Sequence, residues 1–298
     1  MKTRDQKIFS LAAYASMVLV ALMAFLPFLL VFMSSITEES TLVLNGYSFV
    51  PEKTSLYAYR YILSNGDTIF RAYGVTILVT LIGTTLNVTM SAALAYPLSL
   101  KNLPARRFLS FYVLFTLLFN GGLVPTYLLY TNFFHIKNTI WALIVPSLML
   151  HTMNVLLMRS YFSANIPTEL LEAAEIDGAG QFRIFATIVV PLGKPIVVTM
   201  GLFAGLTYWN DWTNGLYYLV GRNGEKLYSI QNLLNKVVSD IQYLSSSTVG
   251  NSAELLGKLP TVSIRMAIAF VAMLPILVLF PFLQRYFIGG ITQGAVKG

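Results

Sequence analysis

Long apolar runs, separated by shorter polar segments, dominate the pattern of this chain. A helix that crosses a bilayer needs about 20 apolar residues. Six windows reach or approach this length and contain no Asp, Glu, Lys or Arg: 11–35, 73–98, 108–130, 140–158, 195–210 and 266–283. The pattern therefore predicts an all-α membrane protein with six transmembrane helices.

The start of the chain has the basic residues and apolar run that also begin a secretory signal. Lys2, Arg4 and Lys7 precede the first window. That window is too long for a signal peptide, and no small-residue cleavage site follows it at the right place. We expect an uncleaved first helix.

Composition strengthens the membrane assignment. Of 298 residues, 56% are hydrophobic and only 11% are charged, and the mean hydropathy is +0.66. A soluble domain has about a quarter of its residues charged. The absence of cysteine excludes structural disulfides, thiolate metal sites and cysteine nucleophiles.

The net charge of +7 does not require a nucleic-acid partner. Lys and Arg are concentrated in both chain ends and in the short segments 99–107 and 159–194. Because short basic segments stay on the cytoplasmic side of a membrane, we expect both termini in the cytoplasm. The segments 36–72, 131–139 and 211–265 would then face outward.

The segment 165–195 between the fourth and fifth windows departs from the transmembrane pattern. Thr168 is a candidate N-cap, and a helix is predicted from it to about Asp177. Gly178 and Gly180 would supply a turn. A second helix would continue through Val190 and end at Pro191.

The first of these two helices has two distinct faces. Small or apolar residues and one acid share a face at i, i+3, i+4 and i+7 spacing: Leu170, Ala173, Ala174 and Asp177. Acidic residues share another: Glu169, Glu172 and Glu175. A small face with an acidic rim suits docking into a groove on another protein. The same pattern also fits an amphipathic loop that rests on its own bundle.

Catalytic motifs are missing from the sequence. It contains no G-x-x-x-x-G-K-[ST] phosphate loop and no H-E-x-x-H metal motif, and His135 and His151 are isolated. We expect no catalytic site, no metal site and no cofactor bound by this chain.

The segment 172–195 resembles the EAA motif of ABC importer permeases. That motif reads EAA-x-x-DGA, then an aromatic residue, I-x-x-P-L and a final proline. Every anchor is present in this chain: Glu172-Ala173-Ala174, Asp177-Gly178-Ala179, Phe182, Ile188, Pro191-Leu192 and Pro195.

The resemblance covers nearly the whole chain and is to the MalG-type carbohydrate permeases, closest to their lipooligosaccharide branch, often called LplC or YtcP. Four further segments are similar to that branch: 120–129 (NGGLVPTYLL), 208–212 (YWNDW), 227–234 (LYSIQNLL) and the C-terminus from 284. Ser229 stands where proline is common, and Gly289 replaces a usual lysine. The resemblance implies the type I ABC importer permease (MetI-like) fold.

A domain division follows from the resemblance. Residues 1–72 would form the N-terminal tail, first helix and external loop. Residues 73–285 would form the permease core with five transmembrane helices and the coupling segment 165–195, and 286–298 a cytoplasmic tail. In the family the EAA segment forms a coupling helix that sits in a cleft of an ATPase subunit. Carried over, the contact residues are Glu172, Ala173, Ala174, Asp177 and Gly178, and 292–298 would also reach the ATPases.

The resemblance also implies partners and a function. The chain would be half of the pathway of an ATP-driven, binding-protein-dependent importer of oligosaccharides or polysaccharide fragments in the bacterial cytoplasmic membrane. It would pair with a MalF-like permease, two ABC ATPase subunits that bind ATP and Mg, and an extracellular solute-binding lipoprotein. Membrane lipid and carbohydrate are the other expected partners, and nucleic acid is not expected.

Candidate pathway residues gather at the outer end of the fifth window and within the third. Aromatic rings stack on sugar faces, and amides offer paired donors and acceptors. The residues of this kind are Tyr208, Trp209, Asn210, Trp212 and Asn120. Trp and Tyr also collect at membrane interfaces, so interface anchoring is an alternative.

Two other functions stay open at this point. The chain would be a free-standing secondary transporter or channel if the loop 165–195 were purely structural. A membrane-embedded enzyme is the third reading, which the missing catalytic motifs disfavour. Ion-coupled transport commonly uses an acid or base in the membrane, and His151 is the sole titratable base in the six windows, which contain no acid.

Overall fold

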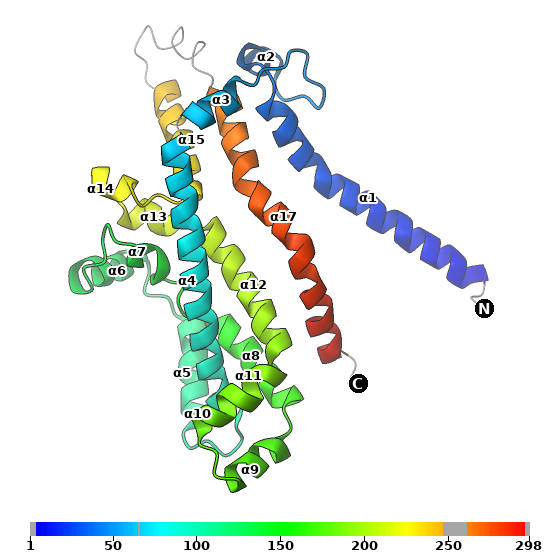
Figure 1. The fold of residues 1–298 in the computed structure, drawn as a ribbon, viewed down its shortest axis with the longest axis vertical. Coiled ribbons are helices and arrows are strands. Elements are labelled where there is room, and N and C mark those ends of the chain that lie inside the picture. The colour runs from blue at the N-terminus through cyan, green and yellow to red at the C-terminus, as the bar shows by residue number, and fades with distance from the viewer. Residues whose placement is uncertain (1–3, 65, 247–260, 296–298) are drawn as a thin grey trace. The chain divides into compact units, whose positions relative to one another are not determined.

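The computed structural model describes residues 4–64, 66–246 and 261–295, which form helices joined by turns (Figure 1). Within these ranges there is no β-strand, only an isolated bridge between Thr37 and Thr54. The all-α class predicted from the sequence is confirmed. The chain divides into two compact units, and each is described by itself: unit 1 comprises 1–69 and 234–276, and unit 2 comprises 70–233 and 277–298.

Unit 1 is built from the N-terminal helices and parts of three long ones. Its own helices are α1 (Arg4–Ser35), α2 (Glu39–Asn45) and α3 (Tyr57–Ser64). It also holds the start of α4 (Gly66–Ser99), the end of α15 (Ile230–Ser246) and the first part of α17 (Thr261–Ala295). The most apolar window of α1 is 0% buried within the chain. Its side chains therefore need lipid or another protein as their surroundings.

The start of α17 is held by a carboxylate from α2. Glu39 Oε1 accepts the N–H of Val262 at 2.8 Å, and Glu39 Oε2 accepts the N–H of Ser263 at 2.8 Å. These are donors of the first helical turn, which have no partner inside the helix. The negative charge also lies at the positive end of the helix dipole. Glu39 thus caps α17 from a segment more than 200 residues away in the sequence.

We expect Glu39→Ala to weaken the start of α17 by about 1 kcal/mol, the usual cost of losing a helix cap. Hydrogen exchange of the Val262 and Ser263 amides should quicken accordingly. Glu38→Ala is the matched control, because the Glu38 side chain makes no cap hydrogen bond. Equal exchange in the two variants would show that Glu39 does not cap this helix.

Unit 2 holds most of α4 and the helices from α5 to α14. The long ones are α5 (Arg106–Leu118), α8 (Thr152–Asn165), α9 (Thr168–Ile176) and α12 (Lys194–Asn210). Shorter helices connect them: α6 (Leu123–Leu128), α7 (Trp141–Ile144), α10 (Gln181–Ile184), α11 (Val190–Leu192), α13 (Thr213–Tyr218) and α14 (Gly221–Glu225). Two π-helical turns, η1 (Leu129–Phe133) and η2 (Phe185–Val189), continue α6 and α10.

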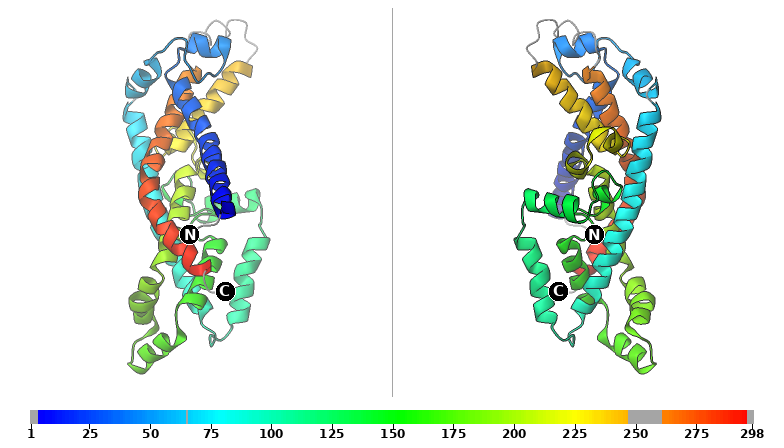
Figure 2. Two further views of the ribbon diagram at one scale, coloured as in Figure 1. Left: turned by 90° about the vertical axis from the view of Figure 1, so that its right-hand side faces the viewer. Right: turned by 90° about the vertical axis from the view of Figure 1, so that its left-hand side faces the viewer.

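Three of the described helices are long and apolar enough to cross a membrane: α1, α4 and α17. Two bent pairs also qualify. The pair from α5 to η1 bends by 109°, which both views of Figure 2 show, and the pair from α10 to α12 bends by 82°. Five of the six predicted windows thus have a candidate span, and the count of six stays a prediction. In the window 140–158, α7 ends at Ile144 and α8 begins only at Thr152.

The 82° bend falls at Gly193, two residues beyond the predicted helix end at Pro191. The π-helical turn η2 widens the helix just before Pro191. The short helix α11 can therefore contain the pyrrolidine ring of Pro191. A Cβ on Gly193 would lie 2.6 Å from Phe162 Cε1 and 2.8 Å from Val189 O. Only glycine therefore fits where the chain turns around the Phe162 ring.

The interruption between α7 and α8 is stabilised by side chains from three other elements. Alternate carbonyls of the segment accept one hydrogen bond each: Ile144 O from Tyr208 Oη (2.9 Å), Pro146 O from Asn214 Nδ2 (3.1 Å) and Leu148 O from Asn87 Nδ2 (2.7 Å). Ser147, between them, has a left-handed φ of 61°. Non-helical backbone at membrane depth is tolerated where such partners exist.

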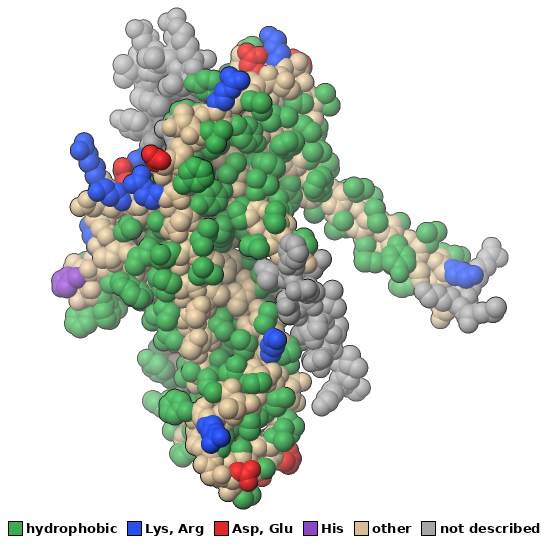
Figure 3. Space-filling model, viewed as in Figure 1, with side chains coloured by type: hydrophobic (Ala, Val, Ile, Leu, Met, Phe, Trp, Pro, Cys, Tyr) green, Lys and Arg blue, Asp and Glu red, His purple; other side chains and the backbone are tan. Residues whose placement is uncertain are grey.

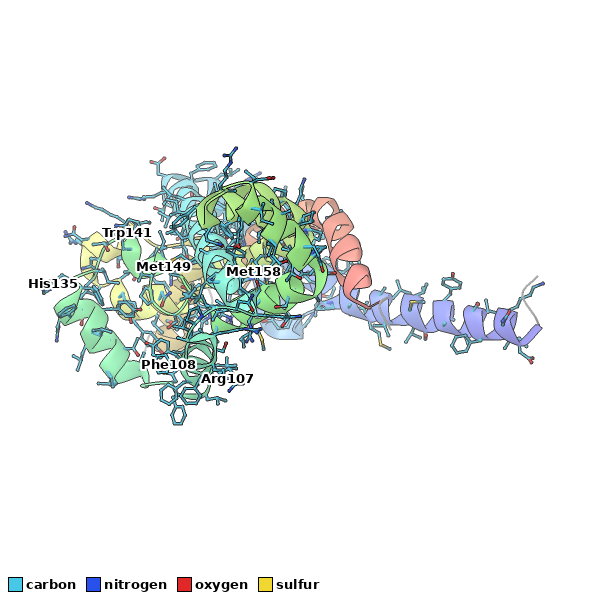
Figure 4. All side chains as sticks on the ribbon, turned by 90° about the horizontal axis from the view of Figure 1, so that it is seen from below. Arg107, Phe108, His135, Trp141, Met149 and Met158 are labelled. Carbon is cyan, nitrogen blue, oxygen red and sulfur yellow. The ribbon has the colours of Figure 1, made fainter. Side chains whose placement is uncertain are left out.

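Buried apolar residues form the interior of unit 2 around α4, α8 and α12. Met158 of α8 is fully buried there, and Figure 4 shows it inside the bundle, whereas Arg107 and Phe108 lie at its edge. On the face drawn in Figure 3, hydrophobic side chains extend along α4, and acidic side chains appear at the end of unit 2 that carries α9. This distribution matches a helix bundle whose surroundings are apolar along its length and polar at its ends.

Candidate functional site

The segment 165–195 forms two helices joined by a tight turn, as the sequence predicts. The first helix, α9, ends at its C-cap Asp177. Its start differs from expectation. Thr168, the predicted N-cap, is the first helical residue, and Pro167 occupies the cap position without a side-chain cap bond. Proline has no N–H and holds an extended backbone at that point, so it ends the preceding segment one residue earlier than expected.

The turn after α9 depends on Gly178. Its φ of +79° lies in the left-handed region, where a side chain costs roughly 1–2 kcal/mol. The N–H of Ala179 donates to Ala174 O at 2.9 Å, and the N–H of Gly178 donates to Glu175 O at 3.0 Å. This pair of bonds is the Schellman motif. Ala174 and Ala179 both pack on the interior of unit 2, which fixes the direction of the chain after the turn.

One side of α9 rests on its own bundle and another side is exposed. Leu171 is only 7% exposed, and it packs with Ala174 against the interior of unit 2. The predicted small face is therefore divided. Ala174 turns inward, whereas Leu170, Ala173 and Asp177 are exposed. The sequence left two interpretations open, a helix that docks on another protein and a helix that rests on its own bundle. The exposed side of α9 fits the first, and the side with Leu171 and Ala174 fits the second.

Two large apolar side chains are exposed to solvent at the tip of this segment. Ile176 is 87% exposed and Phe182 is 92% exposed. They lie on either side of the Gly178 turn, and Glu172 and Asp177 are exposed beside them. We call this exposed surface of Leu170, Glu172, Ala173, Ile176, Asp177, Gly178 and Phe182 the tip surface. Exposed apolar groups rimmed by charge are typical of a protein-binding site.

A chain of hydrogen bonds connects α9 with α4. Tyr96 Oη donates to Gln181 Oε1 at 2.7 Å, and Gln181 Nε2 donates to Glu175 Oε1 at 2.6 Å. The three side chains come from α4, α10 and α9. All three also line a groove of about 900 Å³ between these helices and the α4–α5 turn. The sequence did not identify Tyr96 or Gln181, because neither belongs to a motif anchor and they are 85 residues apart.

Two smaller cavities adjoin the α7–α8 interruption. The first, about 400 Å³, is lined by Asn120, Ser147, Asp211 and Asn214 among others, and we call it the outer cavity. The second, about 280 Å³, is lined by Asn87, His151, Asn154, Thr207 and Tyr208 among others, and we call it the inner cavity. Leu148 lines both. Each cavity combines polar groups with aromatic or aliphatic walls.

The five pathway candidates fall into different surroundings. Asn120 lines the outer cavity, and Tyr208, which is 3% exposed, lines the inner one. Trp209 is buried in the bundle. Asn210 and Trp212 are exposed, and Asn210 Nδ2 donates to Leu206 O of its own helix at 2.9 Å. The structure thus brings two of the five to adjoining cavities.

Asp211 is a further acidic group at the outer cavity, within the 208–212 segment. Its Oδ1 accepts the N–H of Thr213 at 3.1 Å and of Asn214 at 3.4 Å. Burial raises the pKa of this carboxyl above its usual range, and these N–H donors oppose the shift. The sequence signal for Asp211 is an acidic residue within the aromatic and amide segment Tyr-Trp-Asn-Asp-Trp at 208–212. Across the described residues, no three His, Cys, Asp or Glu side chains are grouped to hold a metal.

Comparison with known proteins identifies the family of this chain. Residues 88–293 match the family described as "Binding-protein-dependent transport system inner membrane component". The chain is 36% identical to the polygalacturonan/rhamnogalacturonan transport system permease protein YtcP of Bacillus subtilis, over 98% of this chain and 99% of that one. It is 34% identical to the protein LplC of Bacillus subtilis, over 92% and 89% of the two chains.

A solved structure is similar throughout. A chain of a bacterial ABC transporter involved in the import of the acidic polysaccharide alginate matches with a TM-score of 0.78 and 25% identity, over 96% of this chain and 99% of that one. The MetI-like permease fold expected from the EAA motif is thereby confirmed. The chain belongs to the family of binding-protein-dependent transport system inner membrane components, and it is an ABC permease subunit rather than an enzyme.

Proposed function

We propose that the chain forms half of the translocation pathway of an ATP-driven importer of carbohydrates, taking oligosaccharides or polysaccharide fragments. The comparisons support the solute class, because the name of YtcP refers to polygalacturonan and rhamnogalacturonan and the similar solved structure is of a transporter involved in the import of alginate. The observation that supports the coupling role is the tip surface, an exposed apolar face on a helix whose other face is anchored in unit 2.

In this proposal α9 is the coupling helix. Ala173 and Gly178 allow close approach of an ATPase cleft, and Glu172 pairs with a cationic group there. Asp177 ends the helix and Gly178 turns the chain away. Because Leu171 and Ala174 fix the inner face, a push on the tip surface moves unit 2 with it rather than the helix alone.

The remaining partners follow from the same proposal. A MalF-like permease supplies the other half of the pathway, and two ABC ATPase subunits bind ATP and Mg. An extracellular solute-binding lipoprotein delivers the carbohydrate. Both termini and the segment 165–195 lie on the cytoplasmic side. Residues 292–298 would reach the ATPases, and their side chains lie outside the described residues.

The proposal is tested by comparing two glycines in the purified assembly. Gly178 and Gly180 both have open space where a Cβ would stand, but only Gly178 has a positive φ. Within the chain, Gly178→Ala therefore costs roughly 1–2 kcal/mol of backbone strain, and Gly180→Ala costs little. We expect Gly178→Ala to lose co-purifying ATPase and carbohydrate uptake, and Gly180→Ala to resemble wild type.

Glu172→Gln extends this test without backbone strain, because Glu172 is exposed. Reduced uptake in an assembly that still contains the ATPase would agree with the pairing of Glu172 to a cation. The coupling assignment would be wrong if both Gly178→Ala and Glu172→Gln transported normally in the intact assembly.

The Tyr96–Gln181–Glu175 chain gives a second prediction, about transmission from α9 to α4. Tyr96→Phe and Gln181→Met each remove a link worth about 1 kcal/mol. We expect ATP hydrolysis to continue while the carbohydrate moved per ATP falls severalfold. Glu175→Gln keeps an acceptor oxygen for Gln181 and should couple better than Gln181→Met.

Thr187→Val is the control for this series. Thr187 Oγ1 bonds to Arg183 O within its own helical segment at 2.7 Å, so its loss removes a hydrogen bond but no link to α4. If Thr187→Val lowered the transport ratio as much as Gln181→Met, the effect would be one of local stability and not of transmission.

We further propose that the solute passes the outer and inner cavities, with Asn120 and Tyr208 at their walls. Trp209, Asn210 and Trp212, which follow Tyr208 in the sequence, are the other candidates. Amide and aromatic groups suit the hydroxyls and apolar faces of a sugar. The interruption between α7 and α8 gives both cavities a wall of irregular backbone, which is where pathways form in membrane proteins.

Asn120→Ala should reduce uptake and substrate-stimulated ATP hydrolysis, measured in the assembly with its binding protein. Asn132→Ala is the matched control, because Asn132 lies on the same bent pair, is exposed and lines neither cavity. Asn210→Ala tests the exposed flank. Wild-type values for Asn120→Ala or Asn210→Ala would remove that residue from the pathway.

A further inference from the structure

A small hollow lies where α8 meets α9, at the end of α4. Its volume is about 220 Å³. Its polar lining comes from four helices and a turn of unit 2: Tyr96 and Ser99 from α4, Lys101 from the α4–α5 turn, Arg106 from α5, Ser163 from α8 and Thr168 from α9. Leu100, Phe162 and Ile166 contribute apolar walls. Among the described residues no carboxylate lines this hollow, in contrast to the 900 Å³ groove, which has Glu172 and Glu175 on its wall.

Positive charge is concentrated beside the hollow. Arg106 Nε donates to Leu98 O at 3.1 Å, and Arg159 Nε donates to the same oxygen at 3.2 Å. Two guanidinium groups thus meet at one carbonyl, and Lys101 lies at the same end of α4. Within the described part of the chain, neither Lys101 nor Arg106 forms an ion pair with a carboxylate.

Helix capping accounts for only part of this arrangement. Arginine side chains commonly satisfy the last carbonyls of a helix, and basic residues collect on the cytoplasmic side of a membrane. Neither tendency places cations and four hydroxyl-bearing residues around one hollow that has no carboxylate among its described lining. Like charges held this close repel each other, and an anion between them relieves the repulsion.

The chemistry of the hollow matches a phosphate group. Arg and Lys are the side chains that recognise phosphate oxygens, and hydroxyls donate to the same oxygens. Basic pockets between helices on the cytoplasmic side of membrane proteins bind lipid headgroups. The apolar walls formed by Leu100 and Phe162 would face the glycerol and first methylenes of such a lipid.

We propose that this hollow is a phosphate-binding site, filled by the headgroup of an anionic phospholipid or by inorganic phosphate. Bound phosphate joins the α4–α5 turn, through Lys101 and Arg106, to Ser163 and Thr168 at the root of α9. It thereby restrains the joint between α8 and α9. The inference takes from the proposed function only that the segment 165–195 faces the cytoplasm, and phosphate binding is measured without transport.

The test uses the purified, intact assembly and phosphatidylglycerol as the probe, with retained lipid counted by native mass spectrometry. Loss of one Lys or Arg near a membrane surface weakens the binding of an anionic lipid roughly fivefold. We therefore expect Lys101→Gln and Arg106→Gln each to weaken phosphatidylglycerol retention about fivefold, and the double variant about 25-fold. Arg106→Lys keeps the charge and should recover most of the binding.

Arg107→Gln is the matched control. Arg107 adjoins Arg106, is exposed and does not line the hollow (Figure 4). It should retain phosphatidylglycerol as wild type does. Equal losses in Arg107→Gln and Arg106→Gln would mean general attraction to the basic surface and would overturn the proposal. Unchanged retention in all variants would overturn it as well. If the double variant fails to assemble, the single variants and Arg106→Lys still decide.

A second arm separates the two sources of phosphate. Inorganic phosphate is titrated into the assembly in neutral phosphatidylcholine nanodiscs with and without phosphatidylglycerol, and the thermal midpoint is followed. Stabilisation by inorganic phosphate that Arg106→Gln abolishes assigns the site to the free anion. Stabilisation by phosphatidylglycerol alone, again abolished by Arg106→Gln, assigns it to lipid. No stabilisation by either probe would contradict the site.

Discussion

The arrangement of unit 2 depends on satisfying the backbone carbonyls of the interruption between α7 and α8. An unpaired carbonyl in apolar surroundings costs several kcal/mol. Between α7 and α8, the carbonyls of Ile144, Pro146 and Leu148 are each paired with a side chain from α12, α13 or α4. These bonds allow non-helical backbone in this apolar segment, and both cavities form against it. Without those three donors, the apolar segment would have to be helical and the cavities would lose a wall.

The segment 165–195 uses two faces of a single short helix, α9, in different ways. Leu171 and Ala174 attach α9 to the interior, and the Schellman turn at Gly178 returns the chain to the bundle. The Phe162 ring under Gly193 sets the angle at which the chain then enters α12. A short helix that is fixed on one side can present apolar residues on the other without collapsing onto them. In the proposed function, this fixed position is what would let a partner that pushes on the tip surface move unit 2.

Local chemistry in the sequence predicted much of this structure. The apolar windows predicted the long helices, and the glycine after Asp177 predicted the turn, because both depend on residues close together in the chain. Hydropathy gave no indication of the interruption in the window 140–158, since it measures side chains and not carbonyls. It also missed the contacts of Tyr96 with Gln181 and of Glu39 with Val262, because these partners meet only in the folded chain. The start of α9 was placed one residue wrongly because Pro167 takes the position that a capping side chain would use.

The bonds that support the α7–α8 interruption differ in kind from those inside a helix. A helical ladder opens cooperatively, since each bond fixes its neighbours. Bonds between a carbonyl and a side-chain amide or phenol from a distant part of the sequence break independently of one another. Each can be replaced by a hydrogen bond to water or to a sugar hydroxyl with little change in free energy. The bonds from Asn87, Tyr208 and Asn214 to these carbonyls can therefore break one at a time. If the solute follows the proposed pathway, a hydrated sugar beside Leu148 would replace one of these bonds, and the cavity wall would then rearrange as the cavity fills.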